Sequence, residues 1–233
     1  MTAVVDAVDP ADAVGPADAV DPADVAFIRA TTVLASPPGV PELRLYLGGD
    51  VTGVWERTEA RAGLEQPPPF WAFAWAGGQA LARYLLDHPA TVAGRAVLDI
   101  ACGGGVAAVA AALAGATPVM ASDIDRLAVG ATALNARANG VSVTPVLADV
   151  LDGDGAGAEV VLAGDVCYSR EMTARVVGFL DRAMARGATV LLGDPGRAYL
   201  PIDRFVAVAS YEIPVSRDLE SVEIKRTTIW RPA

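Results

Sequence analysis

The sequence predicts an α/β fold, in which helices cover a mostly parallel sheet on both faces. From Arg95 onward, short apolar runs rich in Val, Leu and Ile alternate with segments of helical periodicity. A turn of three glycines joins the first of these runs to the first helical segment. The last two apolar runs, 205–213 and 222–230, have no helix between them, so we expect them to pair antiparallel.

The alternating part of the chain carries signals for where its elements begin and end. Strands are expected at 97–101, 118–122, 143–147, 160–163 and 189–192, and helices over 105–115, after Asp125 and after Ser169. Asp125 and Ser169 can accept hydrogen bonds from the free amides at the start of a helix. Gly140 and Gly187 follow the last periodic positions, where a left-handed residue commonly ends a helix.

Residues 25–94 are expected to form an N-terminal cap region in front of the core, 95–233. Leu43 to Leu47 alternate apolar and polar side chains, which predicts a strand, and Gly48-Gly49-Asp50 predicts a turn. Three prolines at 67–69 interrupt the chain. A helix is expected to begin near Gly77 and to end at Pro89.

Residues 1–24 differ from the rest of the chain. A hexapeptide is written three times, at 6–11, 12–17 and 18–23, as DAVDPA, DAVGPA and DAVDPA. The segment has no aromatic or basic residue, and six of the 28 acidic residues lie in it. Because it offers little apolar surface to bury, we predict a disordered acidic tail over 1–24 and a folded domain over 25–233.

The composition excludes several classes of protein. The net charge is −10 and the sole lysine is Lys225, which argues against a nucleic-acid partner. Hydrophobic residues make up 53% of the chain, and the uncharged stretch from Ile100 to Ser122 is long enough to span a bilayer. Glycines and Pro118 interrupt that stretch, so we expect no membrane association.

The remaining composition favours a cytoplasmic protein without a metal. No basic residue precedes Arg29, so no secretory signal is expected. Cys102 and Cys167 are too few for a disulfide framework, and with His88 as the only histidine they predict no zinc site. Both cysteines are interpreted as small buried hydrophobic side chains rather than nucleophiles.

The turn Gly103-Gly104-Gly105 predicts a nucleotide-like ligand, because glycines let the backbone approach it at the start of a helix. Gly103, Gly105 and Ala108, with Asp123 further on, also satisfy a dinucleotide fingerprint, so NAD remains an alternative. Asp99 would oppose a pyrophosphate but would suit a free amino group. Acidic residues at three strand ends, Asp99, Asp123 and Asp149, favour a cationic ligand such as S-adenosylmethionine.

These residues resemble the class I S-adenosylmethionine-dependent methyltransferases over about residues 65–230. Four further stretches resemble the bacterial relatives of the electron transfer flavoprotein β-subunit lysine methyltransferase family. They are PPFWAFAWAGGQ at 68–79, GDVCY at 164–168, GDPGR at 193–197 and EIKRT at 223–227. The resemblance implies a Rossmann-like sheet of seven strands with an antiparallel C-terminal hairpin, and methylation of a protein lysine.

The resemblance also implies site residues. The expected cofactor-binding residues are Trp75, Gly78, Gln79, Asp99, Ala101, Gly103, Gly105, Asp123, Ile124, Asp149 and Asp165. Asp165 and Tyr168 occupy the positions of a motif beside the methyl acceptor. The chain departs from the family pattern at Cys167, where an aromatic residue is usual, and at Ala101, where the broad class has glycine.

A lysine acceptor must be neutral to attack a methyl group, yet at pH 7 about one side chain in a few thousand is neutral. An apolar, aromatic channel would lower the pKa of that lysine, and Phe70, Trp71 and Trp75 are candidates to line it. Phe73 is interpreted as core packing.

The candidate catalytic residues are Asp165, which would orient the amine or take its proton, Tyr168 and Asp194, with Arg197 as an anchor of substrate or loop. We expect a monomer acting on a protein such as the electron transfer flavoprotein β subunit. A small amine as substrate, or an NAD-dependent oxidoreductase, are the alternatives.

Overall fold

The computed structural model describes residues 20–155, 157–215 and 222–233. Its helices are α1 (Pro22–Thr31), α2 (Val51–Ala62), η2 (Phe70–Ala72), α3 (Ala76–Asp87), η3 (Pro89–Thr91), α4 (Val106–Leu113), α5 (Arg126–Ala138), α6 (Arg170–Ala185) and η4 (Ile202–Arg204). Its strands are β1 (Val33–Ala35), β2 (Leu45–Leu47), β3 (Val97–Ile100), β4 (Val119–Asp123), β5 (Thr144–Leu147), β6 (Val160–Gly164), β7 (Thr189–Asp194), β8 (Phe205–Pro214) and β9 (Ile224–Pro232).

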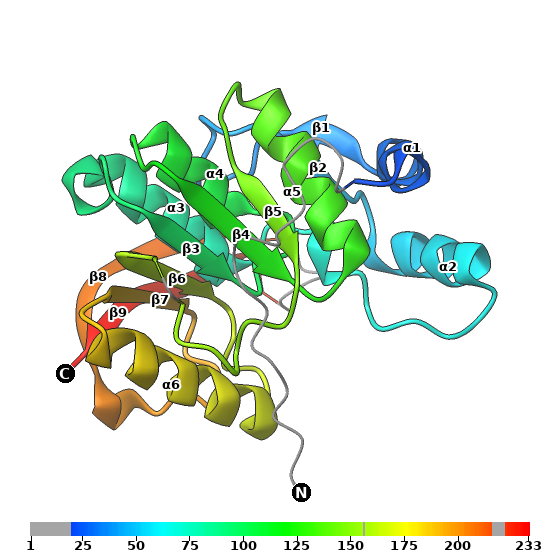
Figure 1. The fold of residues 1–233 in the computed structure, drawn as a ribbon. Coiled ribbons are helices and arrows are strands. Elements are labelled where there is room, and N and C mark those ends of the chain that lie inside the picture. The colour runs from blue at the N-terminus through cyan, green and yellow to red at the C-terminus, as the bar shows by residue number, and fades with distance from the viewer. Residues whose placement is uncertain (1–19, 156, 216–221) are drawn as a thin grey trace, which may run out of the picture.

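Seven of the described strands form one sheet in the order β5-β4-β3-β6-β7-β9-β8 (Figure 1). Strands β3 to β7 are parallel, and β9 runs antiparallel to both β7 and β8. The predicted sheet and its antiparallel hairpin are therefore confirmed. The strand order reverses between β3 and β6, which is where ligands bind in open parallel sheets.

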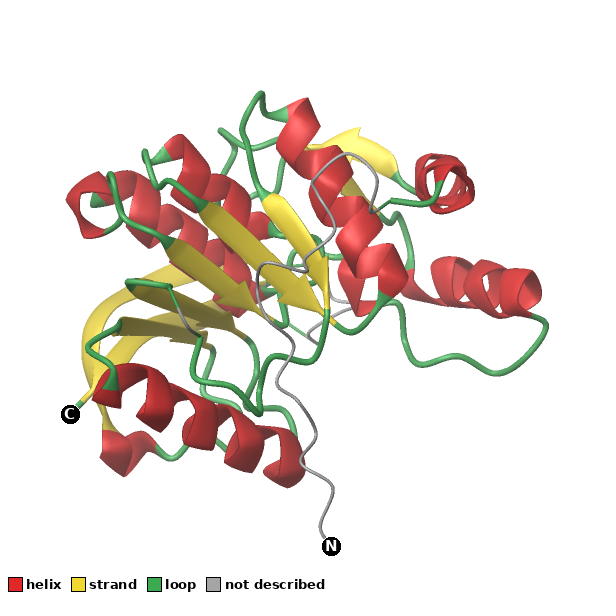
Figure 2. Ribbon diagram, viewed as in Figure 1, coloured by secondary structure: helices red, strands yellow, loops and turns green. Residues whose placement is uncertain are grey.

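Helices α3, α4 and α5 cover one face of the sheet and α6 covers the other (Figure 2). Alternate residues of β6 divide between the two cores: Val160 and Leu162 pack with α3 and α4, whereas Val161 and Ala163 pack with α6. This alternation follows from the pleat of a strand, and it explains why a strand buried on both faces reads as a continuous apolar run.

The predicted helix ends are confirmed at the two helices that border the ligand crevice. Asp125 accepts a hydrogen bond from the Leu127 amide at 2.8 Å, and Ser169 accepts one from the Met172 amide at 3.1 Å. The free amides at a helix start need such partners, so these side chains place the starts of α5 and α6 near the carboxyl edge of the sheet.

The N-terminal cap region contains more structure than was predicted. The strand predicted over 43–47 shortens to β2, which pairs antiparallel with β1. Helix α2 was not predicted; Asp50, expected to lie in a turn, accepts a hydrogen bond from the Gly53 amide and caps this helix. Helix α3 agrees with the prediction within one residue at its start.

The predicted boundary of the acidic tail is wrong at its end. Asp21 caps helix α1 by accepting from the Ala23 amide at 2.8 Å. Asp24 is buried and forms ion pairs with Arg61 of α2 and Arg126 of α5. The third hexapeptide therefore ends inside the folded domain, whereas the first two repeats lie outside the described residues.

Helix α3 packs unusually close to the ends of β6 and β7, and Gly77 makes this approach possible. A Cβ atom at Gly77 would lie 2.2 Å from the Gly193 carbonyl oxygen and 2.5 Å from the Asp165 carboxylate. Both distances are far below van der Waals contact, so only glycine lets the start of α3 reach the strand ends.

Among the described helices, none is long and apolar enough to cross a membrane.

Candidate active site

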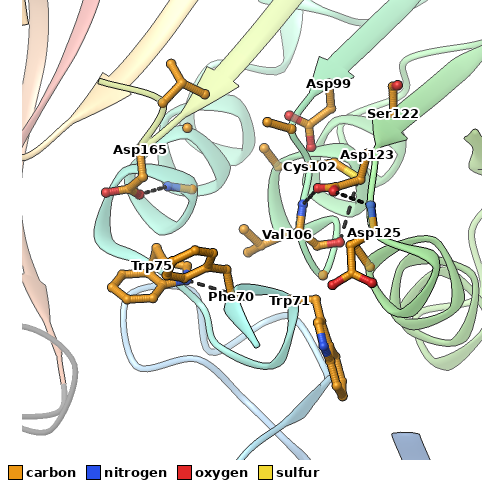
Figure 3. Close-up of a pocket in the computed structure, with 18 of the residues that line it drawn as sticks. Phe70, Trp71, Trp75, Asp99, Cys102, Val106, Ser122, Asp123, Asp125 and Asp165 are labelled. Carbon is orange, nitrogen blue, oxygen red and sulfur yellow. Dashed lines mark hydrogen bonds between the residues drawn. The ribbon is translucent and has the colours of Figure 1, made fainter. Parts of the chain in front are cut away.

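A cavity of about 440 Å³ opens at the carboxyl ends of β3, β4 and β6, and its volume lies in the range usual for small-molecule sites. Its described lining falls into two parts (Figure 3). The glycine side consists of Asp99, Ala101, Gly103, Asp123, Ile124, Asp125 and Asp149. The aromatic side consists of Phe70, Trp75, Gly78, Asp165, Tyr168 and Arg197.

On the glycine side, Asp123 holds the glycine turn in place. One oxygen of its carboxylate accepts from the Gly103 amide at 2.9 Å, and the other accepts from the Asp125 amide at 3.0 Å. From α5, the Thr132 hydroxyl donates to the Gly103 carbonyl at 3.1 Å, and Asn135 Nδ2 donates to the Gly104 carbonyl at 2.8 Å. The turn is therefore fixed by partners from both β4 and α5.

Asp99 is the carboxylate of the glycine side whose pKa is shifted furthest from its usual value. Its side chain is buried, and one oxygen accepts from the Ala108 amide at 3.1 Å. Burial raises the pKa of Asp99 to about 7, although the Ala108 hydrogen bond opposes that rise. No cationic side chain of the described ranges forms an ion pair with Asp99. A buried carboxylate of this kind fits an incoming ligand cation.

The rim of the glycine side offers apolar and polar contacts. Ile124 follows β4 and is 74% exposed, so its side chain is available to a ligand ring. Asp149 accepts from the Leu151 amide at 3.1 Å and pairs with Arg175 of α6 at 2.8 Å. The hydrogen bond from Arg175 lowers the pKa of Asp149. Ala101 adopts φ +48°, a left-handed conformation in which an alanine is strained and a glycine is not.

On the aromatic side, Asp165 binds donors from two directions. One carboxylate oxygen accepts from the Gly77 amide and, at 3.2 Å, from the Gly78 amide at the start of α3. The other accepts from Nε of Arg197 at 3.1 Å and from Nη2 of the same side chain. Asp165 itself has φ +57°, so its backbone is strained to hold the carboxylate there.

Aromatic rings form the wall next to Asp165. Phe70 and Trp75 meet edge to face with ring centroids 5.7 Å apart, and Phe70 and Tyr168 lie 6.3 Å apart. The Arg197 guanidinium lies 5.8 Å from the centre of the Trp75 ring. Phe70 and Tyr168 are each about half exposed, at 49% and 55%, so the wall continues from the cavity to the surface. Desolvation raises the pKa of Tyr168, so its hydroxyl stays protonated near neutral pH.

Three predicted site residues, Gln79, Gly105 and Asp194, do not line the cavity. Gly105 has φ +74° and precedes the first residue of α4. Gln79 was expected to bind the cofactor, but its buried side chain donates to the Ala74 carbonyl at 2.6 Å and accepts from the Gly39 amide at 2.9 Å. Gln79 thus ties the N-terminal cap region to α3. Asp194 was expected to be catalytic, but it is buried and accepts from the Gly196 and Arg197 amides, both at 2.7 Å. It closes the turn after β7.

The two departures from the family pattern have different consequences. Cys167 is buried in the core beneath α6 and does not line the cavity. Burial raises the pKa of both thiols, that of Cys167 to about 11, so both are neutral near pH 7, in keeping with their interpretation as packing residues. Ala101, in contrast, lines the cavity and carries the strain described above.

Some lining residues were not predicted. Of the two buried polar residues on the inner face of α5, Thr132 and Asn135, only Asn135 lines the cavity, and Arg175 reaches the cavity from α6. Polar residues on an otherwise apolar helical face were the available signal for the first two. Trp71 and Phe73 also line the cavity, although both are buried against α5 or its neighbours.

Comparisons with known proteins agree with this geometry. A family model described as ribosomal protein L11 methyltransferase (PrmA) matches residues 80–164. The electron transfer flavoprotein beta subunit lysine methyltransferase of Danio rerio is 37% identical over 207 residues, covering 86% of this chain and 80% of the relative. The protein of the same description from Xenopus laevis is 36% identical, covering 88% and 85%.

A solved structure supports the fold. The magnesium protoporphyrin IX methyltransferase from Synechocystis, solved with bound S-adenosylmethionine, superposes with a TM-score of 0.50 at 19% identity, over 76% of this chain and 83% of that one. The sheet order, the cavity at its carboxyl edge and the extended similarity to the curated relatives lead to one assignment. The chain is a methyltransferase and belongs to the electron transfer flavoprotein β subunit lysine methyltransferase family.

Proposed function

We propose that the protein transfers methyl groups from S-adenosylmethionine to lysine side chains of a protein, and that the electron transfer flavoprotein β subunit is its substrate. The observation that carries this proposal is the division of one cavity into two sides. The glycine side has one buried carboxylate, Asp99, that forms no ion pair among the described residues, and the aromatic side has an apolar wall beside Asp165. The relatives named above are described as acting on that subunit.

The glycine side would hold the cofactor. Asp99 fits its amino group, because a buried carboxylate with a raised pKa is stabilised by a cation. Asp123 retains acceptor capacity for ribose hydroxyls beyond its two amide partners. Ile124 and Asp149 would flank the adenine. The bound cofactor would supply an activated methyl group on a sulfonium.

The aromatic side would receive the lysine. Phe70, Trp75 and Tyr168 offer ring surfaces to its aliphatic stem, and their apolar environment favours the neutral amine. Asp165 would orient the amine for in-line attack. We assign it this role in preference to proton abstraction, because its carboxylate already accepts hydrogen bonds from Gly77, Gly78 and Arg197. Tyr168 would then contribute its ring and hydroxyl to the channel mouth.

The alternatives are less well supported. Asp99 would face the pyrophosphate of NAD in a dinucleotide complex, and two anions in a buried site repel each other. A small amine would leave the exposed rings of Phe70 and Tyr168 without a function at the surface. We further propose a cytoplasmic monomer without nucleic-acid partners, in keeping with the net charge of −10 and with two buried, free cysteines.

Transfer of a labelled methyl group tests the function. The protein is incubated with tritiated S-adenosylmethionine and purified electron transfer flavoprotein, and mass spectrometry locates the modified residue. We expect label on lysine of the β subunit and none on an unrelated control protein with exposed lysines. Label only on free amines in a cell extract would favour the small-amine alternative, and binding of NAD without binding of S-adenosylhomocysteine would contradict the proposal.

A further inference from the structure

We infer that Arg197 neutralises Asp165 so that the acceptor lysine is bound as a neutral amine rather than as an ammonium. This inference rests on the proposed function and assigns Arg197 as a positioning residue for it. Lysine methylation meets an electrostatic conflict here. A carboxylate that orients the amine also stabilises the ammonium form, which cannot attack a methyl group.

The geometry of Arg197 is that of a compensating charge. Two of its nitrogens contact the same oxygen of Asp165, and its side chain is only 21% exposed. The guanidinium also lies over the Trp75 ring, which fixes its plane beside the aromatic wall. Arginine remains protonated at any pH at which the enzyme works, so this compensation does not depend on pH.

The other charged and titratable groups around this point do not replace Arg197. Asp194 lies beneath the loop, where it accepts from the Arg197 backbone amide. The thiol of Cys167 and the hydroxyl of Tyr168 both have raised pKa values and are neutral near pH 7. The remaining charged side chains of the described cavity lining belong to the glycine side or its rim: Asp99, Asp123, Asp125, Asp149 and Arg175, the last two being paired with each other.

Removing either charge of the Asp165–Arg197 pair should shift the pKa of the bound lysine in a predictable direction. Without Arg197, the Asp165 carboxylate is less compensated, the bound ammonium is stabilised and the pKa of the bound lysine rises. Without the negative charge of Asp165, the positive charge of Arg197 remains and the pKa of the bound lysine falls. An opposite or like charge within about 4–6 Å moves a pKa by about one unit or more.

Single-turnover rates of methylation measured against pH test the inference. The substrate is the electron transfer flavoprotein β subunit with tritiated S-adenosylmethionine, because single-turnover rates report the ionisation of the bound complex. For Arg197→Gln we expect the rising limb of the profile to shift to higher pH by about one unit. The rate should be about tenfold lower at pH 7 and should recover at high pH. For Asp165→Asn we expect the rising limb to shift to lower pH, with a lower maximum rate.

Two further variants separate charge from packing. Arg197→Lys keeps the charge but loses the forked geometry, so its maximum rate should fall while the limb stays in place. The double variant Asp165→Asn/Arg197→Gln removes both charges, so its limb should return toward that of the wild type. Far-UV circular dichroism and S-adenosylhomocysteine binding establish that each variant is folded.

The outcomes separate this inference from the proposed function. The inference would be overturned if Arg197→Gln lost rate equally at every pH with its limb in place, or if its limb shifted to lower pH. If that variant does not fold, Asp165→Asn carries the same test with the opposite sign, and an unmoved or rising limb there would overturn it. Failure of the proposed function would instead appear as no transfer to the β subunit by the wild-type protein.

Discussion

The glycine side and the aromatic side of the cavity both present aspartates at strand ends, but their charges are compensated differently. On the glycine side, Asp99 is buried with one amide partner and no ion pair among the described residues. On the aromatic side, Asp165 is bound by Arg197 and by the amides at the start of α3. An aspartate therefore faces the cavity without a cationic partner on the glycine side and paired with an arginine on the aromatic side.

The difference matches the ligands proposed for the two sides. S-adenosylmethionine carries a permanent sulfonium and an ammonium, so carboxylates without a cationic partner favour its binding. A lysine must lose its proton before it attacks the methyl group, and a carboxylate without a cationic partner beside it would stabilise the unreactive ammonium form. The arrangement shows that acidic residues at strand ends cannot be assigned one role from their position alone.

The largest effect is expected from Asp165→Ala. Loss of this carboxylate removes a partner of Arg197 and of the amides at the start of α3, so the acceptor loses its orientation. We expect methyl transfer to fall about 100-fold or more, with the dissociation constant of S-adenosylhomocysteine unchanged within a few-fold. Asp152→Ala is the matched control, because the Asp152 side chain is 92% exposed. Full activity in Asp165→Ala would remove Asp165 from the mechanism.

A smaller effect is expected from Asp99→Asn on the glycine side. The asparagine keeps the size of the side chain but removes the charge that would bind the cofactor amino group. A charge-assisted hydrogen bond contributes about 1.5–3 kcal/mol, so S-adenosylhomocysteine should bind roughly 10- to 100-fold more weakly by calorimetry. Unchanged affinity would mean that the amino group binds elsewhere and that the two sides of the cavity do not differ in this way.

The affinity for the cofactor is also expected to depend on pH through Asp99. Burial raises the pKa of Asp99 to about 7, so the carboxyl is increasingly protonated as the pH falls below that value. Only the ionised form binds a cation well, and the affinity for S-adenosylhomocysteine should therefore fall about tenfold between pH 8 and pH 6. Asp99→Asn should show no such dependence. A dependence that persists in the variant would assign the titration to another group.

The smallest effect is expected from Ala101→Gly. The left-handed backbone at Ala101 costs about 1–2 kcal/mol for a residue with a Cβ atom, and glycine removes that strain at some cost in chain entropy. Urea denaturation should show a gain of up to about 1 kcal/mol in the free energy of unfolding. Ala112→Gly in α4 is the control and should lower stability, because its backbone is helical. A loss of stability in Ala101→Gly would mean that this strain is absent.

Local sequence determined most of the fold. The alternation of apolar runs and helical segments gave the strands β3 to β7, and Asp125, Ser169 and Gly187 gave the ends of their helices. These signals act over a few residues, because capping bonds and the pleat of a strand are local. Helix α2 was missed because Asp50, which caps it, was interpreted as part of a turn. The burial of Asp24 was missed because it depends on ion pairs with two distant helices.

Part of the site could likewise be predicted from local sequence, and part depends on the tertiary structure. The glycine turn and the acidic strand ends were readable from the sequence, since parallel strands bring their carboxyl ends to one edge. The tertiary structure was needed to show that the side chains of Gln79 and Asp194 bind backbone groups outside the cavity lining, and that Arg197 pairs with Asp165 across 32 positions of the chain. Which charges are compensated depends on which loops the sheet order brings together, and no local pattern records that order.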